Sequence, residues 1–252
     1  MLKILKASFF KLFKDRAFKV TLIIGIVLGL LYGLLYSTIG GGLTGYFVLL
    51  SSSSPLSNFG IAVPINLIIF IIGEFNYGTI RNKIIAGNKR SHIFITLLIM
   101  GILYSFILMG VYMGISTALS SIIGGFGDVD PAQLWMTIGY TAILYIMLSA
   151  LSVTTAASIR HTGISVTVTV IILVIGMVAF LISISNSDVN YDMLMALDPI
   201  AISFVNLLGG IIGMGSSGDL IRYLGISMVS CVVYTVLFTG LGLFIFLKRD
   251  VK

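Results

Sequence analysis

The residues best suited to chemistry lie in one short stretch, from Glu74 to Arg90, which follows the second long apolar run. Its only acid, Glu74, opens the pattern Glu-x-x-x-Gly-Thr-x-Arg, which Gly78, Thr79 and Arg81 complete. Glycine permits a sharp bend, and threonine is a good N-terminal cap for a helix. The pattern therefore predicts recognition by charge, in which a projecting basic helix docks into a groove on another protein.

A short helix is expected from Arg81 to Ala86, with Gly87 ending it in a left-handed cap. The alternative is an ordinary basic loop between membrane spans. That alternative explains the Lys and Arg residues, but it does not explain Glu74 or the Gly78-Thr79 pair.

Signatures of catalysis and of metal binding are missing from the chain. No Gly-Lys dipeptide occurs, so a Walker A loop is impossible, and there is no His-Glu-x-x-His motif. The single cysteine, Cys231, lies in an apolar run, and His92 and His161 are far apart. We expect no catalytic residue, no metal site and no cofactor on this chain, which by itself is not an enzyme.

Composition and charge order indicate a membrane protein. Apolar residues make up 58% of the chain and charged residues 10%, far below the roughly 25% charged residues of soluble domains. Fourteen of the fifteen Lys and Arg residues fall at positions 3–19, 81–90, 160 and 248–252, between long apolar runs. Basic residues collect on the cytoplasmic flanks of membrane spans. The alternation predicts a multi-span chain with both termini in the cytoplasm. No continuous basic face interleaved with aromatics occurs, so we expect no binding to nucleic acid. A bacterial plasma membrane is expected from the family resemblance given below.

The apolar runs predict an all-α polytopic membrane protein with six spans in one domain, residues 1–252. About 20 apolar residues cross the hydrocarbon core as a helix. The expected spans are approximately Val20–Ile39, Leu56–Gly73, Ile93–Ile123, Leu134–Ser158, Ile164–Ile184 and Ile221–Leu247. No acid is expected near the middle of a span, which argues against an ion-coupled carrier.

Two segments are expected on the outer side. Gly40–Pro55 is a small outer segment that contains four consecutive serines. Residues 186–220 form a longer one, within which Pro199–Gly215 is apolar enough for a seventh span. A seventh span would place the basic C-terminal tail outside, so re-entrant or surface-lying helices before the last span are preferred.

The first nineteen residues predict an amphipathic helix that lies in the membrane interface. Leu5, Phe9 and Phe13 share one face with Leu2 and Leu12, and the opposite face carries Lys3, Lys11, Lys14 and Asp15. In the first span, Gly25, Gly29 and Gly33 recur every four residues, which suits close helix contact. That contact is either with a second subunit or within the same chain.

The Glu-x-x-x-Gly-Thr-x-Arg motif after the second span, together with this topology, resembles the membrane subunits of type-two ABC exporters along the whole chain. The short loops are most similar to the bacteriocin, lantibiotic-immunity or multidrug branch. The resemblance implies two copies of a cytoplasmic ATP-binding subunit, which carry ATP and Mg, and a second permease half, identical or different. Residues 1–19 would be the elbow helix and residues 74–92 the coupling loop.

The resemblance also implies roles for individual residues. Coupling to the ATP-binding subunit would fall to Glu74, Gly78, Thr79, Arg81, Asn82, Lys83, Ile84, Lys89, Arg90 and Arg160. Gly25, Gly29 and Gly33 would pack against the partner half, and Pro199, Phe204 and Asn206 would belong to the outer gate. The expected function is ATP-driven export of an amphipathic peptide, bacteriocin or hydrophobic drug. The alternative is a membrane channel, scaffold or sensor subunit that needs no ATPase.

Overall fold

In the computed structural model, the described residues are 2–38, 44–55, 59–185, 196–198, 200 and 217–248. Every regular element in these ranges is a helix. The helices are α1 (Leu2–Lys14), α2 (Arg16–Thr38), α3 (Gly45–Ser52), α4 (Ala62–Asn76), α5 (Thr79–Ile85), α6 (Arg90–Gly124), α7 (Pro131–Ile159), α8 (Thr162–Ser185) and α11 (Ser217–Lys248).

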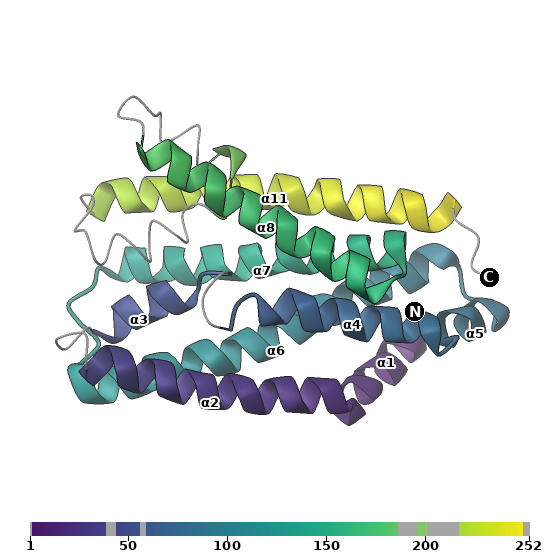
Figure 1. Ribbon diagram of the computed structural model, residues 1–252, viewed down its shortest axis with the longest axis horizontal. Coiled ribbons are helices and arrows are strands. Elements are labelled where there is room, and N and C mark those ends of the chain that lie inside the picture. The colour runs from purple at the N-terminus through teal and green to yellow at the C-terminus, as the bar shows by residue number, and fades with distance from the viewer. Residues whose placement is uncertain are drawn as a thin grey trace.

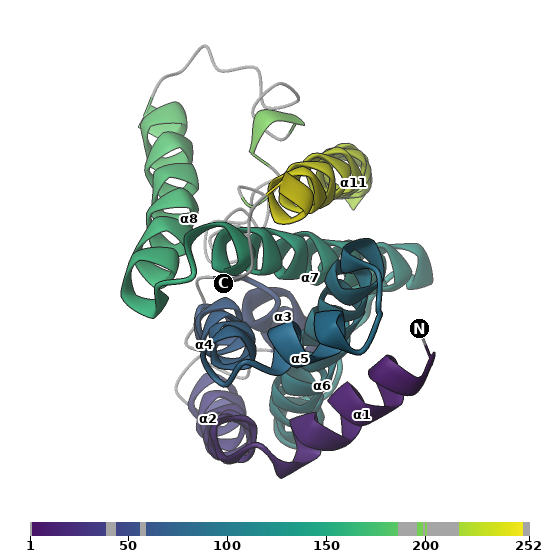
Figure 2. The same cartoon turned by 90° about the vertical axis from the view of Figure 1, so that its right-hand side faces the viewer.

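The long helices run along the longest axis of the molecule (Figure 1). Viewed from the end, α7 lies between α8 and α11 on one side and the group of α2, α3, α4 and α6 on the other (Figure 2). Helix α7 contacts α4, α6, α8 and α11. Of the four long apolar helices it is the most enclosed, since 72% of its most apolar stretch is buried inside the protein. The bundle is therefore built around α7.

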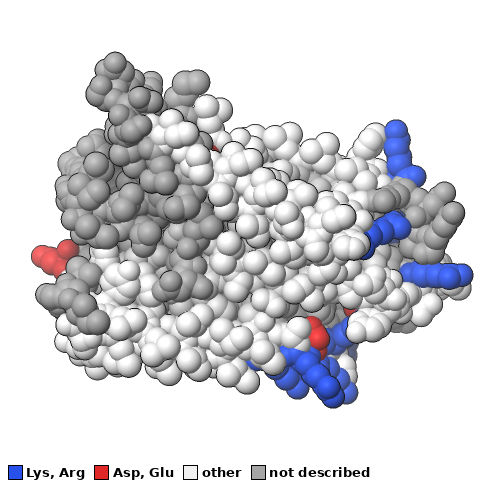
Figure 3. All heavy atoms as spheres, in the orientation of Figure 1, with Lys and Arg blue, Asp and Glu red and all other residues white. Residues whose placement is uncertain are grey.

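The outer surface of the bundle is apolar. Large side chains such as Ile23 and Leu31 on α2, and Val229 and Val236 on α11, are exposed. Lys and Arg gather toward one end of the molecule, and the middle of the face in Figure 3 carries no charged side chain. An apolar belt of this kind with charged ends suits a bilayer. We name the end that holds α1, α5 and the C-terminus of α11 the basic end.

Four helices are long and apolar enough to cross a membrane: α2, α6, α7 and residues Ile221–Lys248 of α11. The bent pair α4 and α5 raises this number to five. Helix α8 covers the fifth expected span. Among its described side chains, the apolar stretch is Thr162–Gly176, which is shorter than the four helices named above. The structure confirms an all-helical bundle within the described ranges, with four or five helices able to span.

The second expected span, Leu56–Gly73, is covered by α4 from Ala62 onward. Helix α4 begins only at Ala62, and the expected outer segment instead contains α3, which packs against α6 inside the bundle. At about 1.5 Å per residue, α3 and α4 are about 12 and 22 Å long. Residues 53–61 separate α3 from α4, and we name this interruption the break.

The break lies level with the middle of α2. A Cβ atom on Gly25 would lie 2.8 Å from the Phe59 ring, and Tyr32 lies beside Ser51. The hydroxyls of Ser51, Ser52 and Ser53 donate to the carbonyls three residues earlier, at 3.2, 3.1 and 2.6 Å. These serines are fully buried. Their hydroxyls cap the end of α3, because the carbonyls at a buried helix end need hydrogen-bond donors from the protein itself.

The three glycines of α2 face the same chain. A Cβ atom would lie 3.0 Å from the Tyr112 carbonyl oxygen at Gly29 and 2.8 Å from the Ser116 carbonyl oxygen at Gly33. Gly25 packs on Phe59, as described above. These contacts support packing within the chain, the second of the two alternatives, because α6 and Phe59 already occupy the glycine face that a partner half would need.

Candidate functional site

Helix α5 projects at the basic end, between α4 and α6 (Figure 1). Gly78 caps its N-terminus with φ 66°, and Gly87 follows its C-terminus with φ 83°. The Gly87 amide donates to the Ile84 carbonyl at 2.9 Å, and the Asn88 amide donates to the Lys83 carbonyl at 3.3 Å. This pair of bonds is a Schellman motif. The expected short helix and its left-handed stop are confirmed, but Gly78 is the cap and Thr79 is not.

Glu74 is almost completely buried at the junction of α4 and α5, at 2% exposure. Its carboxylate forms ion pairs with Lys11 of α1 and, at 3.0 Å, with Lys83 of α5. Lys11 also donates to the Thr79 hydroxyl at 3.4 Å, and Lys83 to the Ser8 hydroxyl at 3.2 Å. We name these five residues the Glu74 cluster. It ties the N-terminal helix to the projecting helix across more than sixty residues of sequence.

The two ion pairs of Glu74 are thus made with lysines of α1 and α5. Arg160 ends α7 in a left-handed conformation with φ 56°, and its guanidinium lies 5.1 Å from the centre of the Phe75 ring. Lys11 was expected on the outward polar face of α1, but it points into the bundle. Sequence reasoning missed this contact because helix periodicity locates faces without saying which face meets protein.

Part of α5 remains open to solvent. Ile80 is fully buried and anchors the helix, whereas Arg81 and Asn82 are exposed and Ile85 is 73% exposed. Lys89 follows as a further exposed cation. Arg90 instead donates to the Leu247 carbonyl at 3.2 Å, which joins the start of α6 to the end of α11. The arrangement presents a rigid basic ridge with one apolar side chain, a surface suited to docking.

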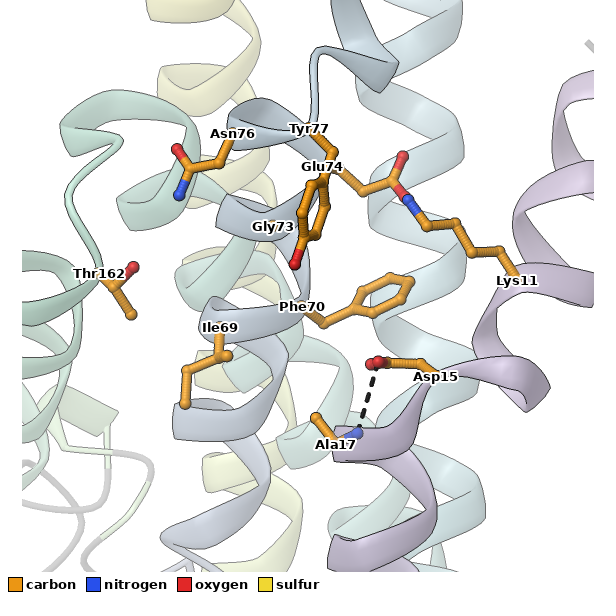
Figure 4. A pocket seen from close by; sticks show the side chains of 10 residues that line it. All are labelled: Lys11, Asp15, Ala17, Ile69, Phe70, Gly73, Glu74, Asn76, Tyr77 and Thr162. Atoms are coloured by element: carbon orange, nitrogen blue, oxygen red, sulfur yellow. Dashed lines mark hydrogen bonds and ion pairs between the residues drawn. The ribbon is translucent and has the colours of Figure 1, made fainter.

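A pocket of about 460 Å³ lies beside this cluster, between the α1–α2 turn, α4 and the start of α8 (Figure 4). We name it the α1–α4–α8 pocket. Ile69 and Phe70 form an apolar wall, and the Tyr77 ring crosses the centre. Polar groups stand on both sides: Lys11 and Asp15 on one, Asn76 and Thr162 on the other.

An acid that the sequence placed in the outer segment reaches the middle of two helices. A Cβ atom on Gly176 of α8 would lie 2.9 Å from the Asp198 carboxylate. The preceding carbonyls, of Ala196 and Leu197, accept hydrogen bonds at 2.8 Å from Ser230 and Tyr234 of α11. Asp198 belongs to the expected outer segment and to none of the expected spans, yet its carboxylate lies beside α8. The gate residues Pro199, Phe204 and Asn206 lie outside the described residues.

In the described part of the chain, no group of three or more His, Cys, Asp and Glu residues could hold a metal ion. Compared with models of known protein families and with curated protein sequences, the chain matches no family and no curated protein significantly.

Proposed function

We propose that this chain is the membrane-spanning permease subunit of an ATP-driven exporter. The observation that carries the proposal is α5, a short basic helix with glycines fixing both ends, which stands out from an otherwise apolar bundle. Two copies of a cytoplasmic ATP-binding subunit, holding ATP and Mg, would dock on Arg81, Asn82, Ile85 and Lys89. This chain would hold no nucleotide and catalyse no reaction itself.

The proposed topology has six spans and both termini in the cytoplasm of a bacterial cell. It counts α8 in full and treats α3 with α4 as one crossing. The basic end then faces the cytoplasm, in agreement with the distribution of Lys and Arg. Residues 186–220 would lie on or re-enter from the outer side. A second permease half, identical or different, would complete the pathway.

The Glu74 cluster supports the proposal because it links α5, where the ATP-binding subunit would dock, to α1 and α4. A push on α5 would act on α1 through Lys83, Glu74 and Lys11, and on α4 through the short Tyr77-Gly78 bend. Nucleotide binding would shift the equilibrium between two bundle states by its unequal affinity for them. The cargo would be an amphipathic peptide, a bacteriocin or a hydrophobic drug, in keeping with the apolar surface.

The test is co-purification with the ATP-binding subunit encoded beside this chain. Arg81→Glu with Lys89→Glu reverses both exposed charges at α5 and should lower the recovered partner by about tenfold or more. The matched control, Lys14→Glu with Lys19→Glu, reverses two exposed lysines at the same end and should leave recovery within about twofold. Equal recovery from both double variants would refute docking at α5.

Asp198 favours a second candidate, a carrier driven by an ion gradient. Ionisable groups at the middle of membrane bundles commonly mark ion pathways. Vesicles that hold the chain without any ATP-binding subunit would then move cargo when an ion gradient is imposed. Asp198→Asn should abolish that movement, while transport that requires ATP and survives an ionophore would exclude this candidate. The channel, scaffold or sensor alternative predicts neither ATP dependence nor uphill movement.

A further inference from the structure

We infer that the α1–α4–α8 pocket binds the headgroup of a zwitterionic phospholipid that carries a primary ammonium, with Asp15 taking the ammonium and Lys11 the phosphate. This site is separate from the docking surface on α5 and does not depend on the nature of the cargo. Its volume of about 460 Å³ lies in the usual range of ligand pockets, roughly 300–1,000 Å³.

Asp15 supplies the acceptor for the ammonium. One carboxylate oxygen caps α2 by accepting the Ala17 amide at 3.4 Å. Among the described residues Asp15 forms no ion pair, in contrast to Glu74, which has two lysine partners. The second oxygen of Asp15 can therefore accept a charge-assisted hydrogen bond from a ligand.

Lys11 supplies a donor for the phosphate. An ammonium has three hydrogens, of which Lys11 uses one toward Glu74 and one toward Thr79. Its side chain is 41% exposed, so the third hydrogen can face the pocket. Opposite charges thus lie on the same side of the pocket, with the Phe70 ring between them in the view of Figure 4. Two charges of opposite sign in one pocket match a headgroup that carries both signs.

The opposite wall and the floor complete the fit to a lipid. The amide of Asn76 and the hydroxyl of Thr162 line the far side, where they can bond glycerol ester oxygens. Ile69 is 41% exposed and continues the pocket along the apolar flank of α4, which gives an acyl chain a path toward the bilayer. Exposed Phe9, Phe10 and Phe13 place α1 at the same interface.

A purely anionic headgroup fits this pocket less well. It would gain one hydrogen bond from a lysine already shared with Glu74, and it would place its charge next to Asp15. A choline headgroup carries both signs, but its trimethylammonium has no hydrogen to donate to the Asp15 carboxylate. The structure therefore favours ethanolamine over both choline and glycerol.

The test is native mass spectrometry of the full chain in detergent, with lipids added singly and in pairs. The probes are dioleoyl phosphatidylethanolamine, phosphatidylcholine and phosphatidylglycerol, together with soluble phosphoethanolamine. We expect the ethanolamine lipid to be retained about tenfold more tightly than the other two lipids, as loss of a charge-assisted hydrogen bond implies. Soluble phosphoethanolamine should not displace it, because it lacks the acyl chain.

Asp15→Asn should remove the preference for ethanolamine, since asparagine keeps the helix cap and loses the charge. Asp130→Asn is the matched control, because Asp130 caps α7 in the same way at the opposite end, accepting the Ala132 amide at 3.1 Å. Should Asp15→Asn fail to fold, Asn76→Ala at an exposed position should weaken retention about threefold. Equal retention of all three lipids, displacement by soluble phosphoethanolamine, or equal losses in the Asp15 and Asp130 variants would overturn the assignment.

Discussion

Replacing Glu74 by glutamine should destabilise the protein through the two lysines that it leaves behind. Removing one partner of a buried ion pair costs about 3–5 kcal/mol, because an uncompensated charge remains. Lys83 is only 14% exposed and keeps most of this cost, while Lys11 at 41% can turn its ammonium to water. We therefore expect a loss of about 3 kcal/mol, at the low end of the range.

The single lysine variants should cost less, because each leaves Glu74 with one cation. We expect about 1 kcal/mol for Lys11→Met, which removes a partly exposed pair, and about 2 kcal/mol for Lys83→Met. The triple variant, with Glu74→Gln added to both, holds no unpaired charge. It should be more stable than Glu74→Gln alone, although it carries two further substitutions.

The measurement is thermal unfolding in detergent, followed by size-exclusion chromatography of the protein that survives heating. About 3 kcal/mol corresponds to a fall in the unfolding midpoint of ~6–12 °C for a chain of this size. Arg81→Met on the exposed side of α5 is the control and should move the midpoint little. A triple variant as unstable as the summed single variants would refute the charge argument and leave only lost packing.

Glycine positions supply three further predictions, each checked by the same unfolding assay. Gly33→Ala should cost about 2 kcal/mol, because its Cβ atom would lie 2.8 Å from a backbone oxygen of α6, whereas Gly110→Ala meets nothing within 4 Å and should be neutral or slightly stabilising. Gly78→Ala should cost about 1–2 kcal/mol, because φ is 66° there, and Gly78→Asn should cost less. Gly60→Ala should lower the stability by more than about 3 kcal/mol, because its Cβ atom would overlap the Ser54 carbonyl oxygen in the break. An Ala variant at position 33 as stable as the one at position 110 would contradict the close-packing explanation.

Long apolar helices could be predicted well from the sequence. The expected third span, Ile93–Ile123, lies within α6 (Arg90–Gly124), and the fourth lies within α7. These helices end where charged residues, glycine or proline end an apolar run, so both the period and the limits are local signals. Helix α5 was likewise set by Gly78 and Gly87, whose positive φ angles only glycine adopts at little cost.

Features that depend on contacts between distant residues could not be predicted in this way. The four consecutive serines were predicted only as part of a small outer segment, and the sequence did not show that Ser51–Ser54 are fully buried. Hydroxyls that cap a helix end are satisfied without water. The partners of Glu74 were missed for a similar reason. Lys11 lies 63 residues away in sequence, and no local pattern distinguishes it from the other cations of α1.

The Glu74 cluster and the break between α3 and α4 lead us to expect a limit on how far a displacement of α5 would travel. At the basic end, a buried carboxylate joins α1, α4 and α5, and the buried Ile80 anchors α5. We therefore expect these three helices to move together. At the other end, α4 is not continuous with α3, and the intervening turn holds Gly60 against Ser54. A continuous helix would transmit a displacement along its axis through the whole bundle. Because α3 and α4 are separate, α4 can tilt while α3 stays packed on α6. A disulfide that fastens α3 to α4 should therefore block any cycle that moves α5. A disulfide between α3 and α6, which are already packed against each other, should leave that cycle intact.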